Sequence, residues 1–435
     1  MNNVTLARAT MGTSLGFHIV FAVLGVGLPL LMFVAEGLWL WRRDPGWLEL
    51  ARRWSKAFGI LFAVGAVSGT ALSFELGLLW PGFMAFSGSI IGLPFSAEGF
   101  AFFLEAVFLA LYLYGWDRLS PVAHWLTSIP IAVSGAASSL FVVMANAWMN
   151  SPAGFHLDAA GKLVSVDPLA AALNPSTATE DPHMLVSAYV VTGFLVAAVY
   201  AAGMLRGRTD LHHRRGLALG MAMAAPAIAL AGITGDSSAR FIYQAQPVKF
   251  AAMEGLYQTQ RGAPIHLGGI PSDSQHRVLF AIEIPYGLSL LAAFDPNAQV
   301  QGLDSYPPDL RPNPVVVHLS FDTMAGLGTL LGLLALGFWI LVVRGRRLPL
   351  QRRLLWALVV AGPAAAVTME AGWFVTEFGR QPWIVYGLIR TSQAATSAPA
   401  LGATFGVFLA IYALLALTSA RLLLRLARGA RQAGA

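Results

Sequence analysis

Nine long apolar runs dominate the 435-residue sequence. A helix needs roughly 20 apolar residues to cross the hydrocarbon core of a bilayer. Only 11% of the residues are charged, whereas about 25% is usual for a soluble domain, so the chain cannot cover a surface that faces water. The sequence therefore predicts an all-α, polytopic transmembrane bundle with spans near residues 14–36, 57–80, 95–115, 125–147, 183–205, 216–234, 315–343, 354–377 and 398–420.

Basic residues are distributed unevenly about these spans. Of the 28 Lys and Arg residues, 19 follow an odd-numbered span: five follow the first, one the third, four the fifth, five the seventh and four the ninth. Because Lys and Arg accumulate on the cytoplasmic side of membrane proteins, we expect the N-terminus outside and the C-terminus in the cytoplasm. The net charge of +6 is then a topology signal and gives no reason to expect nucleic-acid binding.

Two segments outside the membrane are longer than simple turns. Residues 148–182 are polar and acidic, and residues 235–312 are rich in Gly, Pro, Ser and Gln. Long loops either carry function or are disordered, and the second loop contains a helical stretch, QPVKFAAMEGLYQTQ, which favours function. We therefore divide the chain into helices 1–6 over residues 1–234, an extracytoplasmic loop over 235–312, and helices 7–9 over 313–435.

The sequence contains no cysteine, which excludes disulfides, thiolate metal sites and covalently attached c-type haem. A metal would have to be held by His, Met or carboxylate groups. His18, His183, Met324 and Glu377 all lie near the predicted outer ends of spans, where polar residues are candidates for function. His and Met are haem ligands, but each residue also has an ordinary explanation, such as a hydrogen-bonded core imidazole, a gap-filling methionine or an ion pair between Glu377 and Arg380.

The third span carries two carboxyl groups. Glu98 and Glu105 are seven residues apart, which places them on one face of a helix about 10 Å apart. They form either a pair of hydrogen-bonded acids that hold helices together or a relay that carries protons. Ser138, Ser139 and Asn146 of the fourth span would extend such a polar track, or would serve as ordinary interhelical contacts.

The most specific pattern lies at the end of the eighth span. Residues 372–383, GWFVTEFGRQPW, resemble the GWxxxExGRQPW signature of subunit I of the cytochrome bd quinol oxidases. The nine spans and an outside N-terminus agree with this family. The resemblance also covers GFHIVF around His18, EGFAFFLE from Glu98 to Glu105, ANAWMN at 145–150, HMLVSAYVVTGF from His183, GDSSAR at 235–240, KFAAME from Lys249 to Glu254 and SFDTMAGLG around Met324.

The resemblance implies three haem groups. His183 and Met324 would be the axial ligands of a low-spin haem b. His18 and Glu377 would each be the single protein ligand of a high-spin haem, of which one is a haem b and the other a haem d or a second haem b. The resemblance leaves open which of these two sites binds oxygen.

The resemblance also assigns residues beside the haems. Trp373 would lie between haem edges, and Arg380 would bind a haem propionate. Lys249 and Glu254 match quinol-site residues, a donor for the quinone oxygen and a proton acceptor, although without the resemblance they would form an exposed pair on a solvated helix. The loop is short, as in the cyanide-insensitive branch, and Asp322 replaces the Arg of many relatives, which would lower the potential of the low-spin haem unless this carboxyl is protonated.

The implied activity is that of a quinol:oxygen oxidoreductase of the bacterial inner membrane. Quinol, of a type that the sequence does not identify, would be oxidised at the outer face. Oxygen would be reduced to water with protons taken from the cytoplasm through Glu105 and then Glu98, which generates a proton motive force. The family implies a second large membrane subunit and allows a small third one.

Two other classes of protein remain in view. A secondary transporter would use Glu98 and Glu105 as coupling carboxylates, but it would also show paired broken helices or an inverted repeat, which the sequence lacks. A haem b anchor that passes electrons between quinone and a soluble dehydrogenase would leave the GRQPW run without a role. The absorption spectrum of the purified protein distinguishes the three.

Overall fold

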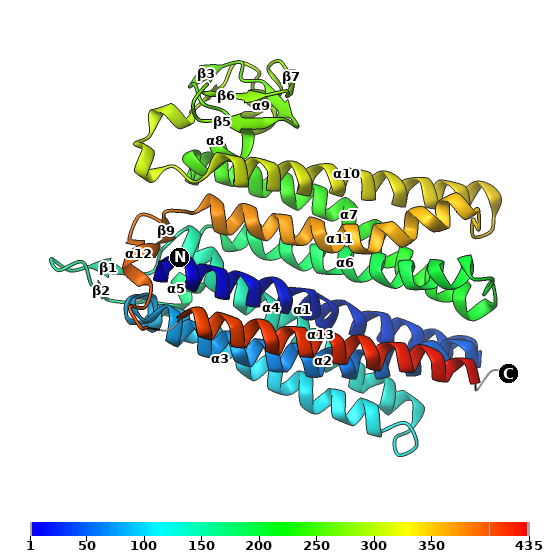
Figure 1. Ribbon diagram of the computed structural model, residues 1–435. Helices are drawn as coiled ribbons and strands as arrows, with labels where there is room; N and C mark the ends of the chain where they lie inside the picture. The colour runs from blue at the N-terminus through cyan, green and yellow to red at the C-terminus, as the bar shows by residue number, and fades with distance from the viewer. Residues whose placement is uncertain (1, 400, 433–435) are drawn as a thin grey trace.

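The computed structural model describes residues 2–399 and 401–432, which form a bundle of long helices (Figure 1). Each of the nine predicted spans falls on one helix to within a few residues, so the predicted fold class is confirmed. In this part of the chain, the helices long and apolar enough to cross a membrane are α1 (Asn3–Arg42), α2 (Pro45–Leu79), α3 (Pro81–Tyr114), α4 (Pro121–Asn150), α6 (Thr177–Leu205), α7 (Leu211–Ala245), α10 (Pro314–Gly345), α11 (Arg352–Gly379) and α13 (Leu401–Gln432).

Local sequence explains where several helices begin. Pro45, Pro81, Pro121 and Pro314 occupy the first turn of their helices, where the missing N–H of proline costs no hydrogen bond. Helix α1 is longer than a membrane requires, because 40 residues at 1.5 Å each extend about 60 Å, against roughly 30 Å of hydrocarbon. The ends of such helices therefore project beyond the apolar layer and can carry polar sites.

Neighbouring helices pack in pairs, α1 with α2, α3 with α4, α6 with α7, and α11 with both α6 and α10. The main hydrophobic core is built largely from α1, α2, α6, α7, α10 and α11. Helices α6 and α7 approach most closely at two glycines, since a methyl group added at Gly193 would lie 2.7 Å from the backbone nitrogen of Ala224 and 2.8 Å from the carbonyl oxygen of Gly220. Small residues at such crossings let two backbones pack tightly.

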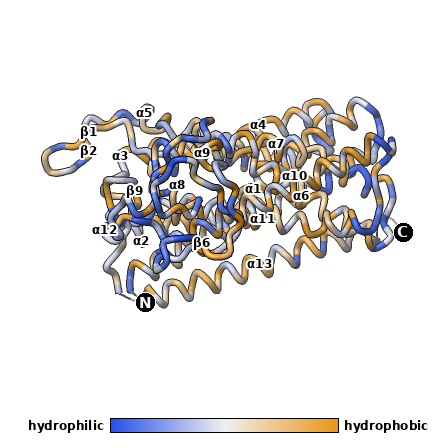
Figure 2. The backbone as a smooth tube through the Cα atoms, turned by 90° about the horizontal axis from the view of Figure 1, so that it is seen from above, coloured by the Kyte–Doolittle hydropathy of each residue, from blue (hydrophilic) through white to orange (hydrophobic). Residues whose placement is uncertain are grey.

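The two ends of the bundle differ in character. The connections 43–44, 115–120, 206–210 and 346–351 and the end of α13 lie together on the right of Figure 1, and we call this the arginine end. The start of α1 and the segments 151–176, 246–313 and 380–399 lie on the left, and we call this the loop end. Figure 2 shows hydrophilic residues concentrated in the loops and at the arginine end, with hydrophobic residues along the helices.

The longest loop differs from the prediction at its start. Helix α7 continues to Ala245, so residues 235–240 are helical and the loop covers 246–313 instead of 235–312. No proline interrupts this polar stretch before Pro247, and Asp236 pairs with Arg240 one turn later at 2.9 Å, which supports the helix. Polar composition alone had suggested a loop.

Short elements fill the loop end. The long loop contains α8 (Pro247–Glu254), α9 (Gly287–Ala293) and three antiparallel strand pairs, β3 (Gln260–Arg261) with β8 (Gln299–Val300), β4 (Ile265–Leu267) with β7 (Ile282–Ile284), and β5 (Ile270–Ser272) with β6 (Arg277–Leu279). Between α4 and α6 lie the hairpin of β1 (His156–Leu157) and β2 (Leu163–Val164) and then α5 (Pro168–Ala172). After α11 come β9 (Trp383–Val385), β10 (Ile389–Arg390) and α12 (Thr391–Ala394).

Candidate functional site

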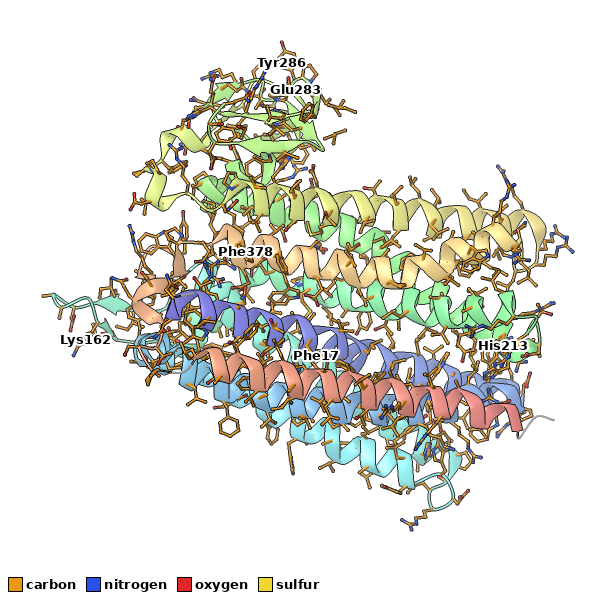
Figure 3. All side chains as sticks on the ribbon, in the orientation of Figure 1. Phe17, Lys162, His213, Glu283, Tyr286 and Phe378 are labelled. Atoms are coloured by element: carbon orange, nitrogen blue, oxygen red, sulfur yellow. The ribbon has the colours of Figure 1, made fainter. Side chains whose placement is uncertain are left out.

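Glu377, in the last turn of α11, is the centre of a hydrogen-bonded group at the loop end. Asn146 Nδ2 donates to its Oε1 at 2.6 Å, and Arg380 Nη2 donates to its Oε2 at 2.6 Å. The ion pair that offered an ordinary explanation for Glu377 is therefore present. A carboxylate has about four acceptor positions, so these two bonds do not prevent Glu377 from binding a metal as well. Figure 3 shows the next residue, Phe378, at the loop end.

Arg380 is 1% exposed but is not fully paired. Its Nη1 donates to Asn150 Oδ1 at 3.4 Å, while its Nε is buried and has no hydrogen-bond partner among the described residues. Buried donors are usually satisfied, so this N–H indicates a partner that is not part of the chain. An anionic group such as a haem propionate has the chemistry that a guanidinium prefers.

Lys249 of α8 reaches the same group from the long loop. Its side chain lies against Gly379, where an added methyl group would be 2.8 Å from Lys249 Cγ, so only glycine gives it space. Burial lowers the pKa of Lys249 to about 8, although nearby Glu180 opposes this shift. Lys249 is only 1% exposed, which excludes the interpretation of Lys249 and Glu254 as an exposed pair on a solvated helix.

Each candidate histidine ligand is oriented by a hydroxyl group. His18 Nδ1 lies 2.9 Å from Ser68 Oγ, and His183 Nδ1 lies 3.1 Å from Thr234 Oγ1. A hydrogen bond at one ring nitrogen fixes the ring and directs the other nitrogen to a metal. The His183 ring also needs Gly235, because a methyl group there would lie 3.1 Å from His183 Cε1.

Met324 of α10 faces α11. A methyl group at Gly372 would lie 3.0 Å from its Sδ, and the next residue, Trp373, packs against the main core. Met324 thus contacts α11, whereas His183 contacts α7. Because no contact joins these two side chains in the described part of the chain, their shared binding of one haem iron stays a prediction.

An open groove of about 500 Å³ runs along α1, α10 and α11, lined among others by Val20, Ser320, Thr323, Glu370 and Phe374. Cofactor sites are typically about 300–1,000 Å³. The groove borders helices that carry three of the four candidate ligands.

Glu370 is a site residue that sequence analysis missed. It lies seven residues before Glu377 on α11, so the two carboxyl groups share a face of the helix. Its Oε1 is buried with no hydrogen-bond partner among the described residues, and Oε2 would be 3.5 Å from a methyl group at Gly16 of α1. The available signal was the same spacing of seven that singled out Glu98 and Glu105.

These observations fit the binding of haem. The residues His18, His183, Met324 and Glu377 are all partly exposed within the bundle, so protein atoms do not cover them completely. Within the described part of the chain no three His, Cys, Asp or Glu residues are grouped to hold a metal ion by themselves. A haem iron needs only one or two protein ligands, because the macrocycle supplies the others.

The carboxyl groups of α3 lie deeper in the bundle. Ser138 Oγ donates to Glu98 Oε1 at 3.1 Å, a bond between α4 and α3 that fits either a polar track or an ordinary interhelical contact. Ser139 instead donates to a carbonyl of its own helix, and Asn146 belongs to the Glu377 group. Glu105 is 5% exposed, and its Oε1 has no hydrogen-bond partner among the described residues.

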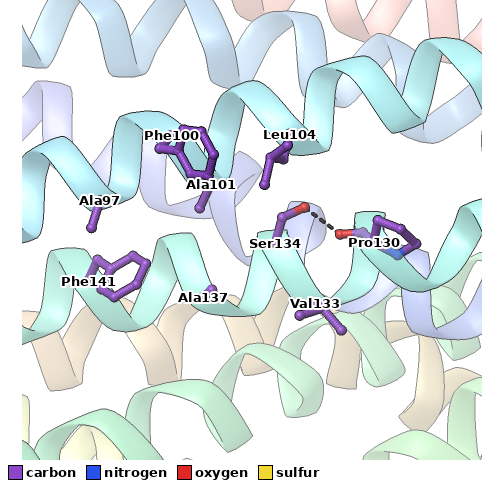
Figure 4. A pocket seen from close by; sticks show the side chains of 9 residues that line it. All are labelled: Ala97, Phe100, Ala101, Leu104, Pro130, Val133, Ser134, Ala137 and Phe141. Atoms are coloured by element: carbon purple, nitrogen blue, oxygen red, sulfur yellow. Dashed lines mark hydrogen bonds between the residues drawn. The ribbon is translucent and has the colours of Figure 1, made fainter.

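A cavity lies between α3 and α4 beside these carboxyl groups (Figure 4). It measures about 340 Å³ and is lined by Ala97, Ala101, Phe141 and other apolar side chains. Its one polar side chain, Ser134, donates to the carbonyl of Pro130 in its own helix. This cavity therefore offers no polar path to Glu98 or Glu105.

Glu254 ends α8 and is 7% exposed. Burial raises its pKa to about 8, and nearby Asp322 adds to this effect. Two histidines fix the end of the helix, since His266 Nδ1 donates to the carbonyl of Glu254 at 2.9 Å and His318 Nδ1 to that of Met253 at 2.7 Å. Sequence analysis missed both histidines, because each contact joins residues that are distant along the chain.

Comparison with known proteins gives concordant results. The family model described as "Cytochrome bd terminal oxidase subunit I" matches residues 6–431. The chain is 38% identical over 424 residues to "Putative cytochrome bd menaquinol oxidase subunit I" of Bacillus subtilis strain 168, covering 95% of this chain and 94% of that protein. It is 29% identical over 462 residues to "Cytochrome bd-II ubiquinol oxidase subunit 1" of Escherichia coli K12, covering 90% and 89%. A solved structure of bd oxidase from Geobacillus thermodenitrificans matches with a TM-score of 0.93 and 38% identity over 98% of each chain.

Proposed function

This chain belongs to the cytochrome bd oxidase subunit I family, and from that premise we propose that it couples quinol oxidation at the loop end to reduction of oxygen to water. The family is one of terminal quinol oxidases, which bind haem and work as membrane complexes with a subunit II. The nine apolar helices agree with a multi-pass protein of the bacterial inner membrane. The assignments of ligands, quinol residues and proton path below are proposals.

Haem, when bound, supplies one-electron redox chemistry and the place where oxygen reacts. We assign His183 and Met324 to a low-spin haem b, and His18 and Glu377 to two high-spin haems, one b and the other d or a second b. The hydroxyl groups at Nδ1 of both histidines support this assignment. Arg380, with its unpaired Nε, would hold a propionate.

Quinol oxidation needs a group that accepts the quinol protons. Glu254 fits this role, because a base works best when its pKa is near the working pH, and burial brings the pKa of Glu254 to about 8. Lys249 is buried against Gly379, so we place it between the quinol loop and Glu377 as a supporting charge. We therefore assign the acceptance of the quinol proton to Glu254.

Proton delivery would use α3. We assign the arginine end to the cytoplasm, because basic residues accumulate on that side. Glu105 and then Glu98, with Ser138 bonded to it, would carry protons toward the loop end. Each charge that crosses the membrane works against about 2.3 kcal/mol per 100 mV, so this path makes the reaction electrogenic.

The observation that carries the proposal is the group of Glu377, Arg380 and Lys249, because it joins the quinol loop to a candidate haem ligand. The test is the absorption spectrum of the purified complex together with its oxygen consumption driven by quinol. We expect haem bands and turnover in the unaltered complex, and in Glu377→Ala the loss of the bands of one high-spin haem together with turnover. A colourless active preparation would contradict the proposal, and b-type bands without quinol-driven oxygen consumption would favour an electron-transfer anchor.

A further inference from the structure

A buried hydrogen-bonded cluster joins α1, α3 and α4 at the arginine end. Glu36, Tyr112 and His124 are 0%, 0% and 2% exposed. The Tyr112 hydroxyl donates to Glu36 Oε2 at 2.6 Å, and Glu36 Oε1 lies 2.7 Å from His124 Nδ1. His124 Nε2 lies 2.8 Å from the carbonyl oxygen of Tyr112. The proposed function above gives these three residues no role.

The bonding pattern fixes the position of one mobile proton. A carbonyl oxygen only accepts, so His124 Nε2 must carry its hydrogen and donate it to Tyr112. The Tyr112 hydroxyl already donates to Glu36 Oε2, so one further proton lies between Glu36 Oε1 and His124 Nδ1. The pair is either a carboxylic acid with a neutral imidazole or a carboxylate with an imidazolium. These two states differ only by transfer of this proton across the 2.7 Å contact.

The cluster continues the line of carboxyl groups on α3. Tyr112 follows Glu105 by seven residues, as Glu105 follows Glu98, so all three lie on one face of the helix about 10 Å apart. Helix α4 runs beside α3 in the opposite direction and contacts both ends of this line. Its His124 belongs to the Tyr112 end, and its Ser138 bonds to Glu98 at the other end.

The unpaired oxygen of Glu105 faces α1 and α4. Its Oε1 would be 3.2 Å from a methyl group at Gly135 of α4 and 3.9 Å from one at Gly25 of α1. Each glycine lies eleven residues, roughly 16 Å along its helix, from the cluster member on the same helix, Glu36 on α1 and His124 on α4. A buried carboxyl oxygen without a protein partner indicates a bound water or a proton. The two glycines leave space for water between α1, α3 and α4.

We propose that Glu36, His124 and Tyr112 form the proton-loading site that supplies Glu105 from the cytoplasm. This inference rests on the proposed function. A proton from bulk water is taken up by the Glu36–His124 pair, and Glu36 becomes protonated at Oε2 as the Tyr112 hydroxyl turns from Glu36 toward water near Glu105. Glu36 Oε2 then gives its proton to the Tyr112 oxygen while the Tyr112 hydroxyl hydrogen passes to that water. Only O–H and N–H bonds break and form, and Tyr112 ends the cycle as a neutral phenol. Water between α1, α3 and α4 bridges the remaining distance, which is roughly 10 Å along α3 from Tyr112 to Glu105 and longer to the Glu105 carboxyl group.

Trp116 stands between the cluster and the surface of the arginine end. Its ring centroid lies 3.8 Å from that of His124, and Arg52 Cζ lies 4.9 Å from the Trp116 ring. Trp116 also packs edge-on against Tyr112, with 5.1 Å between the ring centroids, so a side chain of the α3–α4 connection covers both rings of the cluster. Protons from bulk water would enter beside this indole.

A cluster that only stabilises the packing of α1, α3 and α4 would show the same hydrogen bonds. The test must therefore measure proton uptake directly. The complete oxidase, reconstituted in vesicles, is reduced and mixed with oxygen, and proton uptake is followed with a pH dye. For Glu36→Gln and Tyr112→Phe we expect uptake slowed roughly 10- to 100-fold, with an unchanged haem spectrum and a larger slowing in D₂O. Glu36→Asp keeps a titratable group and should recover part of the rate.

Two further variants make the outcome decisive. Asp44→Asn removes the ion pair of Asp44 with Arg215, which also lies at the arginine end but is not part of the cluster. This variant should leave proton uptake unchanged. Normal uptake in both Glu36→Gln and Tyr112→Phe, even with a lower unfolding temperature, would overturn the inference. If Glu36→Gln does not assemble, Tyr112→Phe decides, because it removes one oxygen and keeps the ring. Glu105→Gln distinguishes failure of this inference from failure of the proposed function. Slow uptake in Glu105→Gln with normal uptake in the cluster variants overturns only this inference. Normal uptake in all of these variants overturns the proposed proton relay as well.

Discussion

At the scale of single residues, the two candidate histidine ligands, His18 and His183, each contact a hydroxyl group through Nδ1. His183 is bonded through Nδ1 to Thr234 and confined by Gly235. We expect His183→Ala to lose the low-spin b-type bands from the absorption spectrum of the purified complex, because one axial ligand is missing. His156→Ala is a suitable control, since His156 is exposed in the β1–β2 hairpin and its loss should leave the spectrum unchanged. Retention of the low-spin bands in His183→Ala would exclude this ligand.

Glu254 gives the quinol reaction a pH dependence. Burial raises its pKa to about 8, so below pH 8 the carboxyl is mostly protonated and cannot accept a proton from quinol. We expect quinol-driven oxygen consumption to rise as the pH increases through about 8, and Glu254→Gln to remove this rise and lower the rate roughly 100-fold while artificial reductants still support oxygen reduction.

Two variants control this measurement. Glu283→Gln changes an exposed carboxyl of the same loop and should keep the rise. Burial lowers the pKa of Lys249 to about 8, so Lys249 loses its charge over the same pH range. Arg stays charged there, so Lys249→Arg should keep the rise in rate if Glu254 causes it. A rate in Glu254→Gln that still rises with pH would show that another group takes the proton.

At the scale of elements, the contact of α6 with α7 depends on glycine. A methyl group at Gly193 would lie 2.7 Å from the backbone of Ala224, so a larger side chain must separate the helices. We expect Gly193→Val to destabilise the bundle by about 1–3 kcal/mol, measured as a lower unfolding temperature. The same change at Gly232 of α7, which has no atoms within 4 Å of an added methyl group, should have little effect. Equal stability of the two variants would show that the helix pair adapts.

Sequence predicted elements better than contacts, for a physical reason. Apolar runs are local, so the nine apolar helices of the described residues agree with the prediction. Polar helical residues do not: 148–150, 177–182 and 235–245 are predicted as loop but belong to α4, α6 and α7. Burial of Lys249 and Glu254 depends on how α8 packs against α10 and α11, which no local pattern records. For Glu370 the spacing of seven to Glu377 is a local signal, but only the packed helices show that its Oε1 is buried without a partner among the described residues.

At the scale of the whole molecule, the absence of cysteine makes the orientation in the membrane easy to test. Single cysteines placed at exposed positions, Ser274→Cys at the loop end and Thr209→Cys at the arginine end, would be the only thiols of the chain. We expect a membrane-impermeant maleimide added outside intact cells to label the first and not the second, because basic connections remain in the cytoplasm. The reverse pattern would place the quinol loop inside the cell and refute the proposed direction of proton transfer.

The packing of Lys249 on Gly379 has a consequence for ligand affinity. Any movement of α8 when quinol binds must displace an ammonium group that lies beside Glu377 and Arg380 in a poorly solvated region. Binding of quinol beside α8 would then change the free energy of binding at Glu377. By thermodynamic reciprocity, binding at Glu377 would change the free energy of quinol binding by the same amount. If haem binds at Glu377 and quinol beside α8, as we propose, a complex that has lost this haem should therefore bind quinol with altered affinity.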